Sequence, residues 1–190
     1  YDTFYIALKT TSASAFTVLW AQDRDFTYYG TGAYGYTPGY ATIANTWKLY
    51  EVPLTSGGGP SSWNALPVWQ TLRISLPSGT DKVDWMRLTD GVAVNHTLTG
   101  ISGCSSCDLW ATYRSGTRYV LVKESFTPSG GSYAWDTQGM APETYTLKVV
   151  DHGAGYGGTA RNGAGETLTI NQAPIAHFLR PSMYSGEDYA

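Results

Sequence analysis

The sequence is poor in charge and has no long apolar runs. Asp, Glu, Lys and Arg together make up 14% of the 190 residues, and the formal net charge is −3. A nucleic-acid partner normally requires a basic patch, which this composition does not provide. No apolar stretch approaches the roughly 20 residues that a membrane-spanning helix needs. We therefore expect no nucleic-acid partner and no membrane insertion.

Cysteine is also scarce, since the two cysteines of the chain, Cys104 and Cys107, both lie in the stretch GCSSCD. Covalent haem attachment would need a histidine after the second cysteine, where Asp108 stands. A zinc site would need two histidines from distant segments, and a redox CxxC normally opens a helix, which the following residues do not predict. The pattern favours a short surface disulfide between Cys104 and Cys107, with two reduced thiols as the alternative. So small a loop restricts the unfolded chain only modestly.

Helical periodicity is nearly absent, and alternation of apolar and polar residues takes its place. In residues 3–9, one face of a strand would carry Phe4, Ile6 and Leu8. The 22 glycines and 9 prolines also disfavour long helices. Further strands are predicted at residues 16–22, 47–53, 70–76, 83–89, 108–113, 119–124, 131–136, 144–150 and 166–170. The fold class that follows is all-β.

The strands fall into two groups, which predicts two domains. Residues 1–94 would form the first and residues 95–173 the second, at the strand spacing of a small sandwich. Residues 174–190 are interpreted as a linker and the start of a further module. A glycine-rich segment at residues 151–165 is predicted as a flexible hairpin tip. The chain opens directly on a strand, which suggests a trimmed piece of a longer protein.

Three stretches together resemble modules of bacterial extracellular multi-domain proteins. TWKLYEVPLTS followed by QTLRISLPSGTDKVDWMRLTD resembles the second half of jelly-roll carbohydrate-binding modules, and FLRPSMYSGEDYA resembles the entry into another such module. GGSYAWDTQGMAPETYTLKVVDHG resembles immunoglobulin-like or fibronectin-III-like modules. The resemblance implies a jelly-roll-like β-sandwich, then an immunoglobulin-like β-sandwich, in an extracellular or cell-surface protein.

The same resemblance implies a structural calcium ion, because jelly-roll modules often hold one with carboxylates and backbone carbonyls. It points mainly at Asp84, with Asp81 and Asp90 flanking the same predicted strand. The alternative is that these are solvated carboxylates of turns.

The richest aromatic stretch is DRDFTYYGTGAYGYTPGY, residues 23–40, with six aromatic rings and four glycines. The glycines and Pro38 predict a loop or a pair of short, bent strands. Tyrosine hydroxyls need water or a polar partner, so exposed rings could stack on the flat faces of a neutral glycan. The rings could instead cover a neighbouring module, or pack on themselves. The candidate ligand-binding residues are Tyr28, Tyr29, Tyr34, Tyr36, Tyr40 and Trp47, although Trp47 lies on a predicted strand, where a core position is more common.

No catalytic constellation rises above chance. Asp23 and Asp25 have the spacing of paired carboxylates, but any D-x-D on a strand has it. There is no G-x-S-x-G elbow and no phosphate-binding loop before a helix. We therefore expect no enzyme. The first hypothesis is a non-catalytic carbohydrate-binding segment of a secreted or surface protein, whose partner is a polysaccharide. The second is a structural or adhesive repeat of an extracellular array or filament, whose partners are neighbouring copies. The second domain carries no candidate site and is predicted to be a spacer.

Overall fold

The computed structural model describes residues 3–21, 34–55, 71–77, 79–89, 92–163 and 165–171. Every regular element in these residues is a β-strand, which confirms the all-β prediction. The described part holds no helix long and apolar enough to cross a membrane. The predicted entry into a further module, residues 174–190, lies outside the described residues.

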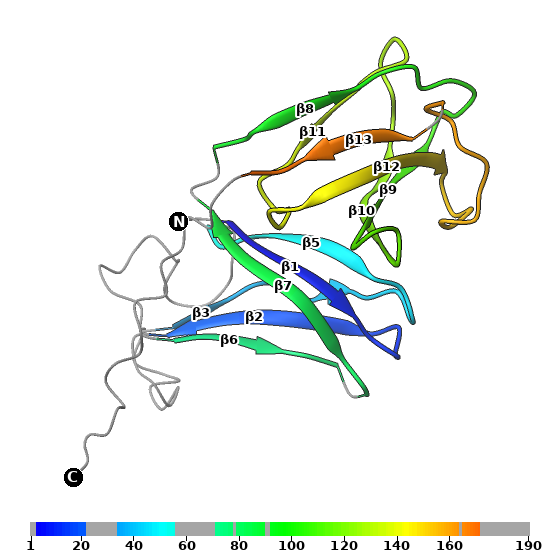
Figure 1. Ribbon diagram of the computed structural model, residues 1–190. Helices are drawn as coiled ribbons and strands as arrows, with labels where there is room; N and C mark the ends of the chain where they lie inside the picture. The colour runs from blue at the N-terminus through cyan, green and yellow to red at the C-terminus, as the bar shows by residue number, and fades with distance from the viewer. Residues whose placement is uncertain are drawn as a thin grey trace.

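The first unit has two layers (Figure 1). One layer is formed by β1 (Thr3–Lys9), β5 (Lys48–Pro53) and β7 (Lys82–Thr89), with β1 in the middle and antiparallel to both neighbours. The facing layer is formed by β2 (Ala15–Ala21), β3 (Tyr34–Tyr36), β4 (Tyr40–Ala41) and β6 (Thr71–Ser75). The core between them contains the side chains of Phe4, Ile6, Leu8, Phe16, Val18, Trp20, Tyr50, Val52 and Leu54.

The second unit also has two sheets. The larger runs in the order β13 (Glu166–Thr169), β12 (Thr144–Asp151), β9 (Cys107–Tyr113) and β10 (Arg118–Phe126). The smaller pairs β8 (Asn95–Leu98) with β11 (Tyr133–Asp136). Leu109, Ala111, Val120, Val122, Leu147 and Val149 from the larger sheet meet Leu98 and Trp135 from the smaller one in a buried core. Alternate residues of β9, β10 and β12 therefore face away from this core.

The two units share one continuous sheet, in the order β13-β12-β9-β10-β5-β1-β7. The junction is a short parallel pairing of β5 with β10, in which Lys48 pairs with Leu121. The amide of Leu121 donates to the carbonyl oxygen of Trp47 at 2.8 Å. The ribbon in Figure 1 shows the second unit continuing from the layer that holds β1, β5 and β7.

Strand β1 is buried on both faces, which joins the units more firmly than the strand pairing alone. Phe4, Ile6 and Leu8 point into the first core, whereas Tyr5 and Ala7 belong to the core of the second unit. All five side chains are at most 4% exposed. The predicted domain boundary at residue 94 stays a prediction. Strand β8, the first strand of the second unit, begins at Asn95, but side chains of β1 belong to the cores of both units.

A loop of the second unit seals this contact. The indole of Trp85 on β7 donates to the carbonyl oxygen of Gly139 at 2.8 Å. The buried guanidinium of Arg87 donates to the carbonyl oxygen of Met140 at 2.7 Å. The hydroxyl of Tyr5 reaches Asp136 at 3.3 Å. The units are thus packed against each other as one body.

Candidate functional site

Of the tyrosines predicted to bind a glycan, Tyr36 is the one that the structure describes as exposed. Its side chain is 42% exposed on β3. Tyr40 on β4 stacks on Phe16 with ring centroids 5.4 Å apart, and burial raises the pKa of its hydroxyl. Tyr34 pairs through its backbone with Ala21. Tyr28, Tyr29, Asp23 and Asp25 lie outside the described residues.

Tyr36 lies on the outer face of the β3-β2-β6 sheet. The strand register places Tyr36 opposite Leu19, and Leu19 opposite Arg73. Val18 and Trp20 point into the core, so Leu19 and its partners point outward. Thr17 and Ser75 form a neighbouring pair on the same face. This face presents a ring, an apolar side chain, a guanidinium and two hydroxyls in adjacent rows.

Trp47 packs at the junction between the units. It is half-buried and packs against the core of the second unit. The guanidinium carbon of Arg118 lies 5.7 Å from its ring centroid. Since its carbonyl also accepts the amide of Leu121, both its side chain and its backbone are used in packing. Its predicted role as a ligand residue stays a prediction, and these contacts favour the core alternative.

The carboxylate of Asp84 is surrounded by cations of the protein itself. It is 5% exposed and pairs with Arg114 at 2.8 Å and Arg118 at 3.2 Å. It also accepts the hydroxyl of Tyr113; burial first, and then this hydrogen bond, raise the pKa of that hydroxyl. A calcium ion at Asp84 would have to displace or approach two guanidinium groups. The calcium prediction therefore gains no support from the surroundings of Asp84.

The other two predicted calcium ligands do not complete a site in the described residues. Asp90 lies outside them. Asp81 is half-buried, and its Oδ1 is buried without a hydrogen-bond partner. The described part of the chain contains no group of three or more His, Cys, Asp or Glu side chains that could hold a metal ion. Calcium binding stays a prediction.

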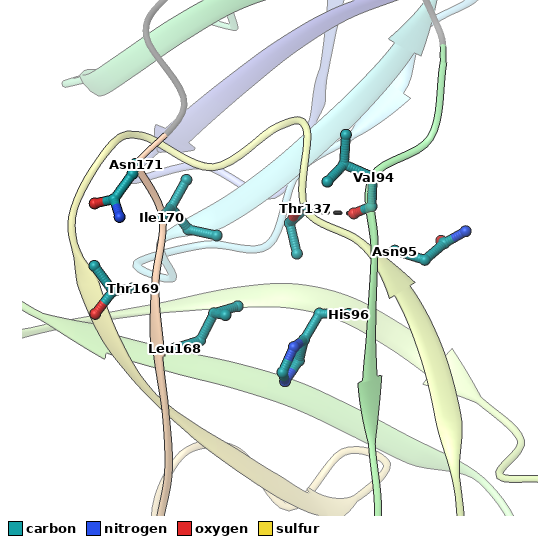
Figure 2. A pocket seen from close by; sticks show the side chains of 8 residues that line it. All are labelled: Val94, Asn95, His96, Thr137, Leu168, Thr169, Ile170 and Asn171. Atoms are coloured by element: carbon teal, nitrogen blue, oxygen red, sulfur yellow. Dashed lines mark hydrogen bonds between the residues drawn. The ribbon is translucent and has the colours of Figure 1, made fainter.

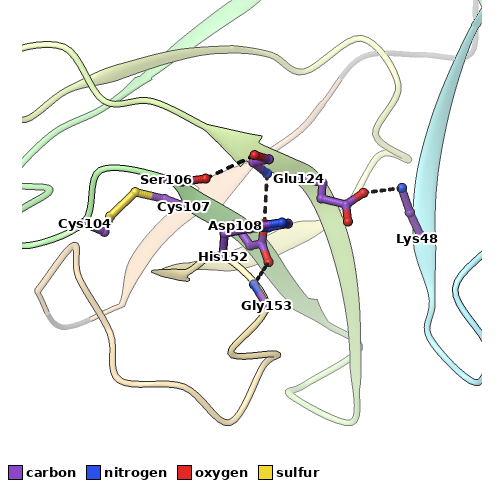
Figure 3. Close-up of polar contacts among 9 residues, drawn as sticks. Lys48, Cys104, Ser106, Cys107, Asp108, Glu124, His152 and Gly153 are labelled. Atoms are coloured by element: carbon purple, nitrogen blue, oxygen red, sulfur yellow. Dashed lines mark hydrogen bonds and ion pairs between the residues drawn. A yellow bond between two sulfur atoms is a disulfide. The ribbon is translucent and has the colours of Figure 1, made fainter.

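Cys104 and Cys107 form a disulfide, which agrees with the favoured reading of the CxxC pair (Figure 3). Cys107 is the first residue of β9 and is fully buried. The bridge therefore holds the chain where it enters the central strand of the second unit.

The next residue, Asp108, anchors the glycine-rich loop (Figure 3). Its carboxylate, 5% exposed, accepts the amides of Ser125 at 2.9 Å and Gly153 at 3.0 Å and pairs with Nδ1 of His152 at 2.8 Å. Burial raises the pKa of Asp108, but the hydrogen bonds from Ser125, His152 and Gly153 outweigh it, so the pKa lies below its usual value. The hydrogen bond to Asp108 raises the pKa of His152.

The Asp108–His152 pair resembles two members of a catalytic triad, but the described residues place no hydroxyl on the second ring nitrogen of His152. A triad needs a hydroxyl on the second ring nitrogen of the histidine. Within the described residues, the contacts of His152 through its ring are with Asp108. The nearby hydroxyls of Ser106 and Ser125 pair with each other at 3.1 Å. The arrangement suits loop anchoring, with no nucleophile in place.

Sequence reasoning missed an aromatic cluster on the outer face of the β10-β9-β12 sheet. Trp110 lies on β9 and Tyr119 on β10, both facing away from the core of the second unit. Tyr156, from the glycine-rich loop, folds over this face and stacks on Tyr119 with centroids 4.6 Å apart and an interplanar angle of 6°. A tryptophan at a position where alternation predicts a polar residue was the available signal, since Leu109 and Ala111 face the core.

A separate pocket of about 410 Å³ lies between β8 and β13 (Figure 2). His96 and Leu168 point toward each other across it, and Thr137 donates to the carbonyl oxygen of Val94. His96 also pairs with Glu166 at 2.6 Å, which ties the two strands together. Both strands lie at the edge of their sheets in the described residues. The pocket therefore marks an open side of the second unit.

No protein-family model, curated protein sequence or solved structure matches the chain.

Proposed function

We propose that the chain is a non-catalytic carbohydrate-binding segment of a secreted or cell-surface protein. Neutral polysaccharide would bind on the outer face of the β3-β2-β6 sheet. The observation that carries this proposal is the exposed ring of Tyr36, which lies in one cross-strand row with the side chains of Leu19 and Arg73. A flat ring supplies contact area to the apolar face of a sugar, and it loses little conformational entropy on binding.

The polar side chains beside Tyr36 support the same ligand class. Arg73 supplies donors, while Thr17 and Ser75 supply hydroxyls that can both donate and accept. A few polar groups around an apolar surface are typical of sites that orient a small polar ligand. The low charge of the whole chain, 14% of residues, also suits a neutral partner better than a highly charged one.

Affinity electrophoresis of the 190-residue chain tests this proposal. The gels would contain hydroxyethylcellulose, xyloglucan, galactomannan or pullulan, and the retardation gives the affinity. We expect Tyr36→Ala to weaken binding about fivefold or more, because truncation of an aromatic anchor commonly costs about 1 kcal/mol or more. Tyr36→Phe keeps the ring and should bind nearly as well as the unmodified chain.

Met86→Ala is the matched control, because Met86 is 50% exposed on β7, which belongs to the other layer of the first unit. Its retardation should equal that of the unmodified chain. Equal retardation of Tyr36→Ala and Met86→Ala on every polysaccharide that binds would remove the Tyr36 site from the proposal.

A structural or adhesive repeat is the second candidate, and the edges of β8 and β13, which are unpaired within the described residues, favour it. The order β13-β12-β9-β10 facing β11-β8 would suit the expected immunoglobulin-like sandwich, with strands G, F, C and C′ facing E and B. Strand A of such a sandwich would lie beside β8, where the described residues hold no strand. An edge of this kind can accept a strand from a neighbouring copy. Concentration-dependent sedimentation tests this function: assembly without polysaccharide retardation would favour the repeat over the carbohydrate-binding segment.

A further inference from the structure

The aromatic cluster of the second unit is an ordered stack that leaves one of its rings, Tyr119, partly exposed. The ring centroid of Tyr156 lies 4.6 Å from the ring centroid of Tyr119 and 4.9 Å from the ammonium nitrogen of Lys148. Tyr119 stacks on Tyr156 and remains 46% exposed. The exposed part of its side chain is available to a ligand.

Contacts with Trp110 and Lys148 hold the stack in place. Trp110, 5% exposed, makes edge contacts with Tyr119 at 5.9 Å and with Tyr156 at 6.0 Å. Lys148 donates to the carbonyl oxygen of Tyr156 at 2.7 Å, which fixes the loop that carries the ring. Because these contacts already order the ring of Tyr119, a ligand that stacks on it loses little further entropy.

A hydroxyl-lined groove begins beside the partly exposed ring. Tyr119 pairs with Thr112 across β10 and β9, and their side chains lie on the same outer face. Thr112 lines a cavity of about 480 Å³ together with Ser115, Thr144 and Thr146. This volume lies in the range of about 300–1,000 Å³ that small-molecule sites occupy. The apolar ring and the polar groove therefore adjoin.

The charges around the groove favour a neutral ligand. Glu143 lines it and accepts the amide of Arg114 at 2.9 Å. The nearby guanidinium groups of Arg114 and Arg118 are paired with Asp84. Hydroxyls that both donate and accept, one carboxylate and one flat apolar ring suit a sugar ring, whose faces are apolar and whose rim carries hydroxyls.

We propose that Tyr119 and the groove beside it form a second binding site for neutral polysaccharide, located on the second unit. This inference rests on the proposed function and extends it to the unit that sequence reasoning interpreted as a spacer. Because the two units pack on each other through β1 and β5, the two sugar-binding faces would be held in one body. One chain would present two sites at a fixed separation.

The experiment uses the 190-residue chain and the four polysaccharides named above, with Tyr119→Ala, Tyr36→Ala and the double variant. Tyr119→Ala should weaken retardation about tenfold, as expected for loss of an ordered aromatic anchor. Tyr119→Phe and Met86→Ala should bind like the unmodified chain. In hydrogen exchange, polysaccharide should protect the backbone at residues 112–119 and 143–146, and Tyr119→Ala should abolish that protection, whereas Tyr119→Phe should keep it.

The outcomes separate the two sites. Weaker binding by Tyr119→Ala with local loss of protection supports the second site, whether or not Tyr36→Ala has an effect. Unchanged binding by Tyr119→Ala, with binding lost in Tyr36→Ala, overturns the second site and leaves the proposed function standing. If the unmodified chain is retarded by none of the four polysaccharides, both proposals are overturned.

Discussion

Gly139→Ala would test the junction between the two units. A Cβ atom at this position would lie 2.3 Å from one ring carbon of Tyr5 and 2.8 Å from two others. The Tyr5 ring is 4% exposed and its hydroxyl contacts Asp136, so it has little room to turn away. The alternative is that the loop lifts and breaks the hydrogen bonds from Trp85 to Gly139 and from Arg87 to Met140.

Both responses to the added methyl group destabilise the fold. Overpacking a filled core costs about 1–3 kcal/mol. Lifting the loop would lose two hydrogen bonds of about 0.5–1.5 kcal/mol each, with a higher cost where a buried charged group loses its partner. We therefore expect a loss of about 1–3 kcal/mol. At about 2–4 °C per kcal/mol for a chain of this size, the melting temperature should fall by about 2–12 °C.

Gly157→Ala is the matched control for differential scanning calorimetry. It makes the same chemical change in the second unit, where a Cβ atom would meet nothing within 4 Å. Its melting temperature should be unchanged or slightly raised, because alanine restricts the unfolded chain. Combining Gly139→Ala with Tyr5→Ala should cost less than the sum of the two changes, since the clashing ring is gone. Equal melting temperatures for Gly139→Ala and Gly157→Ala would refute the close packing of Gly139 on Tyr5.

The remaining predictions concern two buried carboxylates. Asp108 raises the pKa of His152, so their contact stabilises the fold fully below the unfolded pKa of histidine, and the stabilisation is lost as the pH rises through the folded pKa. The lowered pKa of Asp108 affects stability in the opposite direction. The stabilisation that Asp108 provides is present above its unfolded pKa and disappears as the pH falls through its folded pKa. The urea midpoint of the unmodified chain should therefore exceed that of His152→Asn by more at about pH 6 than at about pH 8, and an equal difference would contradict the pairing. Asp84→Asn removes a charge that faces Arg114 and Arg118 and should lower the free energy of unfolding by about 1–3 kcal/mol, measured by urea denaturation. Because these two arginines already neutralise Asp84, EDTA should leave the melting temperature of the unmodified chain unchanged, and a fall would show that the chain binds a metal ion.

The strands were predictable wherever alternation is strong. Residues 3–9 coincide with β1, and the segment 144–150 coincides with β12 to within one residue. The expectation of short, bent strands within residues 23–40 holds for β3 and β4. Strand β8 was missed because its sequence, NHTL, is short and mostly polar. Alternation in the sequence reveals a strand only where one face of that strand is clearly apolar.

The junction and the aromatic stack depend on tertiary pairing, which alternation does not reveal. Tyr5 and Ala7 would face solvent in an isolated two-layer unit, and they are buried because the core and the Gly139 loop of the second unit pack on that face of β1. Tyr156 lies among glycines that predict a flexible tip. It is ordered because Asp108 and Lys148, distant in sequence, hold its loop. Contacts of this kind connect segments whose local patterns are independent.

The packed junction between the units fixes the position of the two proposed sugar-binding faces relative to each other. Two sites joined by a flexible linker act at an effective concentration that depends on linker length, and they tolerate many ligand geometries. Here Tyr36 and Tyr119 lie on outer faces of one packed body, so the distance between them is fixed by β5 and β10. A fixed distance favours polymers whose sugar rings recur at that distance and disfavours others. Loosening the junction with Gly139→Ala should therefore weaken binding to long polysaccharides more than binding to short oligosaccharides, because each site would stay intact while their geometry is lost.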